Sequence, residues 1–204
     1  MKRPGDRFMT SNGDMLQDVK FFPLTKDRWK DFEWLFGEKG ACGGCWCMWW
    51  KLTKSEFEKN KGEANKKLMK RIVESNETPG ILAYHNSEPI GWCAVAPRDK
   101  YPTLERSNIL KRVDDRPVWS IVCFYIDRRY RKAGLTTAML EFIIDYCRKQ
   151  GAEIIEGYPV DPIKSNMPPV FAWTGFASSF RKAGFKEIAR RSKTRPIMRY
   201  ELRK

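Results

Sequence analysis

Residues 121–137, IVCFYIDRRYRKAGLTT, decide the fold. They begin inside an almost continuously apolar segment, 118–126, which is typical of a central strand covered on both faces. From Leu135 onward, apolar side chains recur at steps of three and four, which predicts a helix over about 133–149. A basic turn joins the two elements. The stretch therefore predicts a strand, a turn and a helix in direct succession.

This basic turn has the features of an anion site. The first turn of a helix carries free backbone N–H groups and a partial positive charge, which together bind phosphate. Gly134 removes a side chain where an anion would approach the backbone, while Arg131 and Lys132 add positive charge at the rim. On physical grounds alone, a phosphate site and an ordinary strand-to-helix turn with exposed basic residues fit equally well.

The flanking sequence predicts a single α/β domain with a mixed sheet over residues 21–204, preceded by a loose N-terminal extension at 1–20. Thr53 and Glu56 have the spacing of a capping box, which begins a helix. Strands are expected at 80–84, 90–96, 118–126, 153–157, 186–190 and 197–202, with a hairpin turn at 86–89. Helices are expected at 26–37, 54–75, 133–149 and 172–183, and a helical turn at 104–112 lies within a long loop at 97–117.

Composition limits the possible partners. The chain has 204 residues, a formal net charge of +14 and 42% hydrophobic residues, so it is long enough for a real core. The charge makes nucleic acid the first partner to consider, but the basic residues are widely spread and no nucleic-acid-binding signature is present. No apolar run approaches the roughly 18 residues that cross a bilayer. We therefore expect a cytoplasmic protein with no membrane partner and reduced cysteines. Cys93, Cys123 and Cys147 lie inside apolar runs and are expected to pack as small core hydrophobes. Oligomeric state is not readable from the sequence.

Two common nucleotide motifs are missing: G-x-G-x-x-G after a strand, and G-x-x-x-x-G-K-[ST]. Instead, Arg131-x-x-Gly134-x-Thr136 resembles the R/Q-x-x-G-x-G/A signature of the GNAT superfamily of acyl-CoA N-acyltransferases, with Thr136 as a mild departure. Phe180-x-x-x-Gly184-Phe185 resembles the Y-x-x-x-G-F of that family. The predicted order of elements over 21–202 is also similar. The resemblance implies a mostly antiparallel central sheet flanked by helices.

The resemblance also implies a cofactor site for acetyl-CoA as the acyl donor. The splayed end of the fourth strand would pair with the pantetheine arm, and one of its N–H groups would polarise the thioester carbonyl. The amine acceptor would then attack directly, with both substrates bound. The residues implied for the cofactor are Phe124, Tyr125 and Ile126 on the strand, Arg131 at the rim, and Lys132, Ala133, Gly134, Leu135, Thr136 and Thr137 through their amides.

Proton transfer is the part of the chemistry where this chain departs from the family. Phe180 stands where the family often has a tyrosine that protonates the leaving thiolate. A thiol of pKa about 8.5 leaves tolerably well as the thiolate, whereas an alkyl amine of pKa about 10.4 needs a base before it attacks. Candidate bases are Glu156, Asp161 and Tyr125, and Tyr158 is a candidate replacement acid. Each of them also fits a purely structural role as a surface carboxylate or a core phenol.

Residues 42–50, CGGCWCMWW, are rich in cysteine and tryptophan. In folds of this family, the corresponding region helps wall the acceptor site, so we expect Trp46, Cys47 and Trp49 to line it and Asp161 to contribute to acceptor binding. Aromatic faces suit a planar or cationic acceptor. Core packing is the alternative, especially for Trp49. Three thiols are fewer than the four ligands usual for structural zinc, so no metal is expected. His85, the only histidine, is expected to be structural.

Three functions stay open at this stage. The first is an N-acetyltransferase acting on a primary amine, with a small-molecule acceptor favoured because the aromatic loop suggests a walled pocket. The second is a basic nucleic-acid-binding protein. The third is a non-catalytic domain that binds acyl-CoA as a sensor, which Phe180 keeps open.

Overall fold

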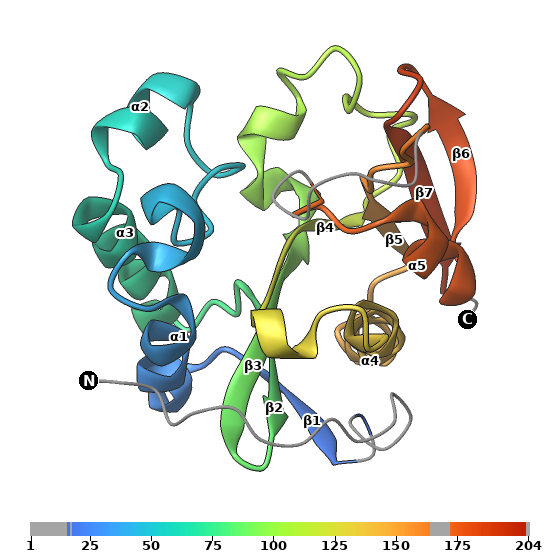
Figure 1. Cartoon of the computed structure of the whole chain (residues 1–204). Helices are drawn as coiled ribbons and strands as arrows, with labels where there is room; N and C mark the ends of the chain where they lie inside the picture. The colour runs from blue at the N-terminus through green and yellow to red at the C-terminus, as the bar shows by residue number, and fades with distance from the viewer. Residues whose placement is uncertain (1–15, 17, 164–171, 203–204) are drawn as a thin grey trace.

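The computed structural model describes residue 16 and residues 18–163 and 172–202. Its strands form one seven-stranded sheet in the order β1-β2-β3-β4-β5-β7-β6 (Figure 1). Neighbouring strands are antiparallel except β4 and β5, which are parallel and are joined through helix α4. The strands are β1 Val19–Pro23, β2 Gly80–His85, β3 Glu88–Pro97, β4 Trp119–Ile126, β5 Ile154–Gly157, β6 Lys186–Arg190 and β7 Pro196–Glu201. The fold class is therefore the mixed, mostly antiparallel α/β sheet that the sequence predicts.

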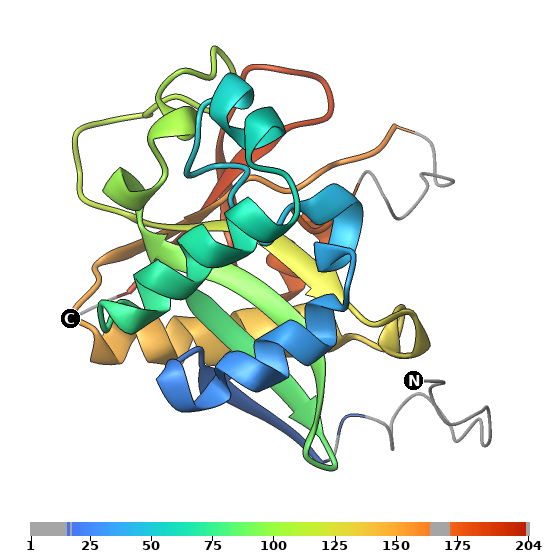
Figure 2. The same cartoon turned by 90° about the vertical axis from the view of Figure 1, so that its left-hand side faces the viewer.

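Helices cover both faces of this sheet (Figures 1 and 2). One face carries α1 Trp29–Phe36, α2 Lys54–Lys59 and α3 Glu63–Glu74, and the other carries α4 Leu135–Lys149 and α5 Ala177–Lys182. Each face has its own apolar core. Trp92 of β3 lies in the first core, with Phe32 and Met69 of the covering helices. Cys93 points the opposite way, into the second core with Met139 and Phe180, because side chains alternate along a strand.

Several expected elements differ in extent from those of the structure. The hairpin turn is only Asn86 and Ser87, whose φ values of 48° and 64° suit a two-residue turn. The capping box at Thr53 is present, but the expected helix at 54–75 is interrupted at Gly62, which has a φ of 81°. The expected helix at 172–183 shortens to α5. The helical turn expected at 104–112 corresponds to a short 3-10 helix at Pro102–Leu104 and to turns, one of which has a hydrogen bond from the Lys111 N–H to the Ser107 carbonyl at 3.0 Å.

The N-terminal boundary also shifts. Val19 and Lys20, placed in the expected loose extension, pair with His85 and Tyr84 of β2 as part of β1. Most of that extension, residues 1–15 and 17, lies outside the described residues. Among the residues that are described, no helix combines the length and the hydrophobicity needed to cross a bilayer.

The sheet opens between β4 and β5. These strands pair only as far as Ile121 and Gly157, and β4 continues beyond that point without β5. Pro159 follows soon after β5 and has no N–H, so it cannot extend the ladder. A register irregularity between Ala94 and Val95 leaves Val122 of β4 unmatched on β3, just where the strands part. The edge of β4 from residue 122 onward is therefore available to other partners.

We predict that Gly157→Ala lowers the free energy of unfolding by about 1–3 kcal/mol, because overpacking a filled core displaces its side chains. An added Cβ would lie 2.1 Å from Cε1 of the buried Phe180 ring. Gly91→Ala is the matched control, since its Cβ would meet no closer atom than Leu135 Cδ2, at 3.3 Å. Urea denaturation of both variants measures the difference, and equal costs would contradict this packing.

Candidate active site

The basic turn after β4 presents an open row of backbone amides. Lys132 and Gly134 have φ values of 65° and 88°, and α4 begins directly after Gly134 without a side-chain cap. Among the described residues, none accepts a hydrogen bond from the N–H groups of residues 132–136. Alternating left- and right-handed residues before a helix form a concave nest of N–H donors that suits an anion. Arg131 is exposed at its rim, where its Nε donates to the carbonyl of Ile126 at 3.0 Å.

The seven residues predicted for this turn divide between the turn itself and the start of α4: Arg131, Lys132, Ala133 and Gly134 form the turn, and Leu135, Thr136 and Thr137 begin the helix. The N–H of Thr137 already donates to the carbonyl of Gly134 at 2.9 Å, so the donors with no acceptor among the described residues lie before it. Leu16 lies beside the turn, with Cδ1 at 3.4 Å from where a Cβ on Gly134 would stand.

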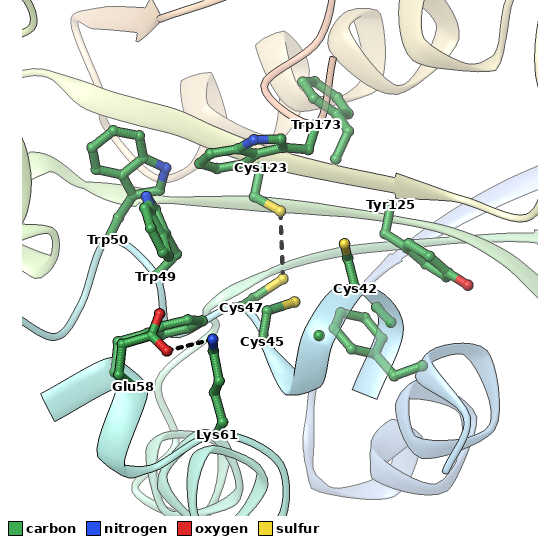
Figure 3. Close-up of a pocket in the computed structure, with 15 residues that line it drawn as sticks. Cys42, Cys45, Cys47, Trp49, Trp50, Glu58, Lys61, Cys123, Tyr125 and Trp173 are labelled. Atoms are coloured by element: carbon green, nitrogen blue, oxygen red, sulfur yellow. Dashed lines mark hydrogen bonds and ion pairs between the residues drawn. The ribbon is translucent and has the colours of Figure 1, made fainter. Parts of the chain in front are cut away.

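A cavity of about 300 Å³ lies against the same strand (Figure 3). Its walls are mostly aromatic and sulfur-containing, and they come from α1, the loop at 40–50, α2 with the turn that follows it, and β4. Glu58 supplies a carboxylate to the cavity wall, and it forms an ion pair with Lys61, which also lines the cavity. The lining residues are Phe36, Ala41, Cys42, Gly43, Cys45, Cys47, Trp49, Trp50, Phe57, Glu58, Lys61, Cys123, Phe124, Tyr125 and Trp173.

Four residues predicted for the site line this cavity: Cys47, Trp49, Phe124 and Tyr125. Cys123, which the sequence suggested as a core hydrophobe, is only partly buried and also lines it. Side chains alternate along β4, so Cys123 and Tyr125 face the cavity side together. The Phe124 ring instead packs on the Phe180 ring, with centroids 6.2 Å apart.

The cavity thiols influence one another. A hydrogen bond from the Cys47 thiol lowers the pKa of Cys45 to about 6. Burial, together with the hydrogen bonds to Cys123 and Cys45, raises the pKa of Cys47. Cys45 is therefore the thiol that is ionised at neutral pH, and Cys47 stays protonated beside it. No set of three or more His, Cys, Asp or Glu side chains within the described ranges is arranged to hold a metal ion.

The edge of β4 that β5 leaves unpaired forms hydrogen bonds with two tryptophans of this chain. The N–H of Phe124 donates to the carbonyl of Trp173 at 2.6 Å, and the carbonyl of Val122 accepts from Trp50 Nε1 at 3.0 Å. The rings of Trp50 and Trp173 also pack together, with centroids 5.7 Å apart. The strand edge expected to receive pantetheine thus pairs with this chain's own tryptophans in this state.

Glu156 and Tyr158, the predicted base and acid, are buried outside the cavity. Glu156 is 1% exposed, and neither residue lines the cavity. Oε1 of Glu156 accepts from Arg98 Nη1 at 3.0 Å and from the Tyr158 hydroxyl at 2.7 Å, and Oε2 accepts from Arg199 Nε at 2.7 Å. Burial, reinforced by the Glu156 charge, raises the pKa of Tyr158 well above its usual value. Both side chains belong to a buried network of ion pairs and hydrogen bonds.

Trp46 and Asp161 also lie away from the cavity. Trp46 is buried, and its ring stacks on Phe36 at 5.6 Å, so it supports the cavity wall from behind. Asp161 pairs with Arg181 and Arg190 on the surface, and these two arginines lower its pKa. Both were predicted to bind the acceptor; in the structure neither lines the cavity, and their contacts are ring packing for Trp46 and ion pairs for Asp161.

Sequence reasoning missed several lining residues, above all Trp173, Cys45, Phe57 and Glu58. Trp173 follows residues 164–171, which lie outside the described residues, and no local pattern links it to β4. Cys45 carried a usable signal, because it lies in the same cysteine-rich loop as Cys47. His85 has the structural contact expected of it, with Nδ1 at 3.2 Å from the Tyr130 hydroxyl.

If Glu156 is structural, Glu156→Gln lowers the free energy of unfolding by about 3 kcal/mol, because two buried guanidinium groups lose their shared charge. Asp161→Asn is the matched control: its ion pairs are exposed, so its loss costs less than about 1 kcal/mol. Chemical denaturation gives both values. A Glu156→Gln protein of normal stability and abolished turnover would restore the base assignment.

The Cys45 thiolate predicts a distinct alkylation profile. Only the thiolate reacts with iodoacetamide, so the rate at Cys45 rises with pH, reaches half its maximum near the pKa of about 6, and levels above it. Mass spectrometry of alkylated peptides over a pH series measures this. Cys47→Ala removes the hydrogen bond and moves the midpoint upward, toward about 8.5. A wild-type midpoint near that value would contradict the thiol arrangement.

Comparison with known proteins agrees with this geometry. The family model of the acetyltransferase (GNAT) family matches residues 46–162, more than half of the chain. No match was found among curated protein sequences. A GNAT-family acetyltransferase of Listeria monocytogenes has a TM-score of 0.54 at 10% identity, over 90% of this chain and 95% of that one. The PaiA N-acetyltransferase of Thermoplasma acidophilum, solved with coenzyme A, has a TM-score of 0.50 at 15% identity, over 90% and 98%. The chain belongs to the GNAT family of acetyltransferases.

Proposed function

We propose that this acetyltransferase moves the acetyl group of acetyl-CoA to a primary amine by direct attack, with donor and acceptor bound together and a small molecule as the acceptor. Acetyl-CoA is the acyl donor of the family. The observation that carries the proposal is the double role of β4. Its residues 123–125 line the aromatic cavity, and the chain then leads into the turn with the open amides of residues 132–136.

For the donor, the amide turn holds the pyrophosphate and the edge of β4 holds the pantetheine arm. The Phe124 N–H must then exchange the Trp173 carbonyl for a pantetheine group or the thioester oxygen. Such an exchange trades one hydrogen bond for another, so its net cost is small, on the order of 1 kcal/mol. The freed N–H would stabilise the oxyanion that develops during attack.

For the acceptor, the cavity offers aromatic walls with few polar groups. Trp49 is 38% exposed and lies at the wall, edge-on to the Phe57 ring at 4.9 Å. A planar amine of small-molecule size fits such walls, and an ammonium group is attracted to their faces before it loses its proton. Of the predicted catalytic residues, Tyr125 lines the cavity, so we assign proton transfer from the amine to it, directly or through water.

Gly134→Glu is expected to abolish acetyl-CoA binding, because a carboxylate at the turn repels the pyrophosphate and fills its approach. Calorimetric titration measures this directly. Gly151→Glu is the matched control: Gly151 has a similar φ of 77°, compared with 88° for Gly134, and follows the far end of α4. The control should bind as the wild type does. Equal binding by all three proteins would place the pyrophosphate elsewhere.

Trp49→Ala is expected to raise the KM for the acceptor about tenfold while the KM for acetyl-CoA changes less than about twofold, because only acceptor contacts are lost. A panel of amines is first screened by release of the CoA thiol, and the best acceptor is used. Trp34→Ala on α1 is the control, since Trp34 is exposed and outside the cavity lining. Tight acetyl-CoA binding with no turnover on any amine would favour the acyl-CoA sensor over the enzyme.

A further inference from the structure

Four of the six cysteines line one cavity, and they come from two segments that face each other across it (Figure 3). Cys42, Cys45 and Cys47 come from the loop at 40–47, and Cys123 comes from β4. Cys47 Sγ and Cys123 Sγ are 3.7 Å apart, and both thiols are free. The remaining cysteines, Cys93 and Cys147, are buried in the core on the other face of the sheet. The cavity group is therefore spatially separate from the packing cysteines.

The loop that carries three of these thiols has an unusual backbone. Ala41, Trp46 and Cys47 have φ values of 62°, 37° and 54°, although none is a glycine. Such conformations cost free energy and persist only where the surroundings enforce them. Here the Gly44 carbonyl accepts from the Gly62 N–H at 3.0 Å and from Asn65 Nδ2 at 3.3 Å. In this backbone conformation, the side chains of Cys45 and Cys47 point into the cavity that β4 lines.

The thiols in this row differ in reactivity. Cys45 carries the thiolate, which is the form that attacks peroxides. Cys47 lies between Cys45 and Cys123, and its thiol donates a hydrogen bond to Cys123 Sγ at 3.7 Å (Figure 3). An oxidised sulfur at Cys45 is thus next to a thiol that can condense with it, and that thiol is next to a second one on the opposite wall.

We propose that the cavity is a redox-modification site, in which hydrogen peroxide oxidises Cys45 and the oxidation is passed on to form a reversible Cys47–Cys123 disulfide. In the first step, the Cys45 thiolate attacks peroxide and becomes a sulfenic acid, with hydroxide as the leaving group. The Cys47 thiol then condenses with that sulfenic acid to give a Cys45–Cys47 disulfide and water. Last, Cys123, as its thiolate, attacks Cys47 Sγ and releases Cys45 as a thiolate, and the weakly basic Cys45 is a good leaving group.

The final bond requires only a local movement. A disulfide has an S–S length of about 2.05 Å, so the two sulfurs approach by roughly 1.7 Å. The loop contains Gly40, Gly43 and Gly44, which permit such an adjustment. The bridge would cross the cavity beside Phe124. The consequence for activity rests on the proposed function: because the cavity is there the acceptor site, the Cys47–Cys123 bridge blocks acceptor binding until a dithiol reduces the bridge.

The test treats the reduced full-length protein with hydrogen peroxide and measures three quantities. Intact mass is expected to fall by two hydrogen atoms, peptide mapping is expected to find residues 47 and 123 crosslinked, and acetyl transfer is expected to fall more than about tenfold and to recover with dithiothreitol. The first two readouts do not need turnover. A crosslink in a protein with no transferase activity would leave this proposal intact and contradict only the proposed function.

Variants separate this route from general oxidation, each compared with its own untreated sample. Cys123→Ser should stop at the Cys45–Cys47 disulfide, give no crosslink between positions 47 and 123, and lose less activity on oxidation than the wild type. Cys45→Ser should form the crosslink more slowly. Cys147→Ala, which changes a buried thiol outside the cavity, should behave as the wild type does. Two results would overturn the proposal. One is a gain in mass by added oxygen without a crosslink, and the other is a loss of acetyl-transfer activity in Cys123→Ser that equals the wild-type loss and is not reversed by dithiothreitol.

Discussion

β4 and β5 run parallel and hydrogen-bonded only as far as Ile121 and Gly157, and the features of the candidate site depend on this early separation. A strand that continues without a neighbour exposes one row of backbone groups in the middle of a sheet. Because those groups need partners, they create a place where an extended molecule can bind. Here Trp50 and Trp173 supply the partners, and the same tryptophans form the wall of the cavity.

A network of buried charged side chains lies at β5 next to this separation. Glu156 of β5 is paired with Arg98 and Arg199, and Tyr158 donates to it as well. Buried ion pairs gain little net stability when complete, but removing one member is costly because the others stay buried. The network therefore ties β5 to Arg199 of β7 and to Arg98, beside the point where β4 and β5 separate. Its residues position the site without touching the cavity.

The sequence predicted the parts of this architecture that local patterns determine. Helix α4 and the turn at Gly134 follow from a regular apolar period and a glycine at a helix start, and both lie where expected. The role of Glu156 was beyond such reasoning, since its partners Arg98 and Arg199 lie 58 and 43 residues away in the chain. Cys123 was misjudged because an apolar strand shows two faces but not which of them meets a cavity. β1 was missed because its five residues follow a polar segment and include Lys20 and Pro23.

The central claim is that the free edge of β4 is the donor site and that acetyl-CoA replaces Trp173 there. A crystal structure of the protein with coenzyme A tests it most directly. The account predicts pyrophosphate on the amides of residues 132–136 and a pantetheine group, instead of the Trp173 carbonyl, within hydrogen-bond distance of the Phe124 N–H. Coenzyme A bound elsewhere, with the Trp173 carbonyl still on Phe124, would contradict it.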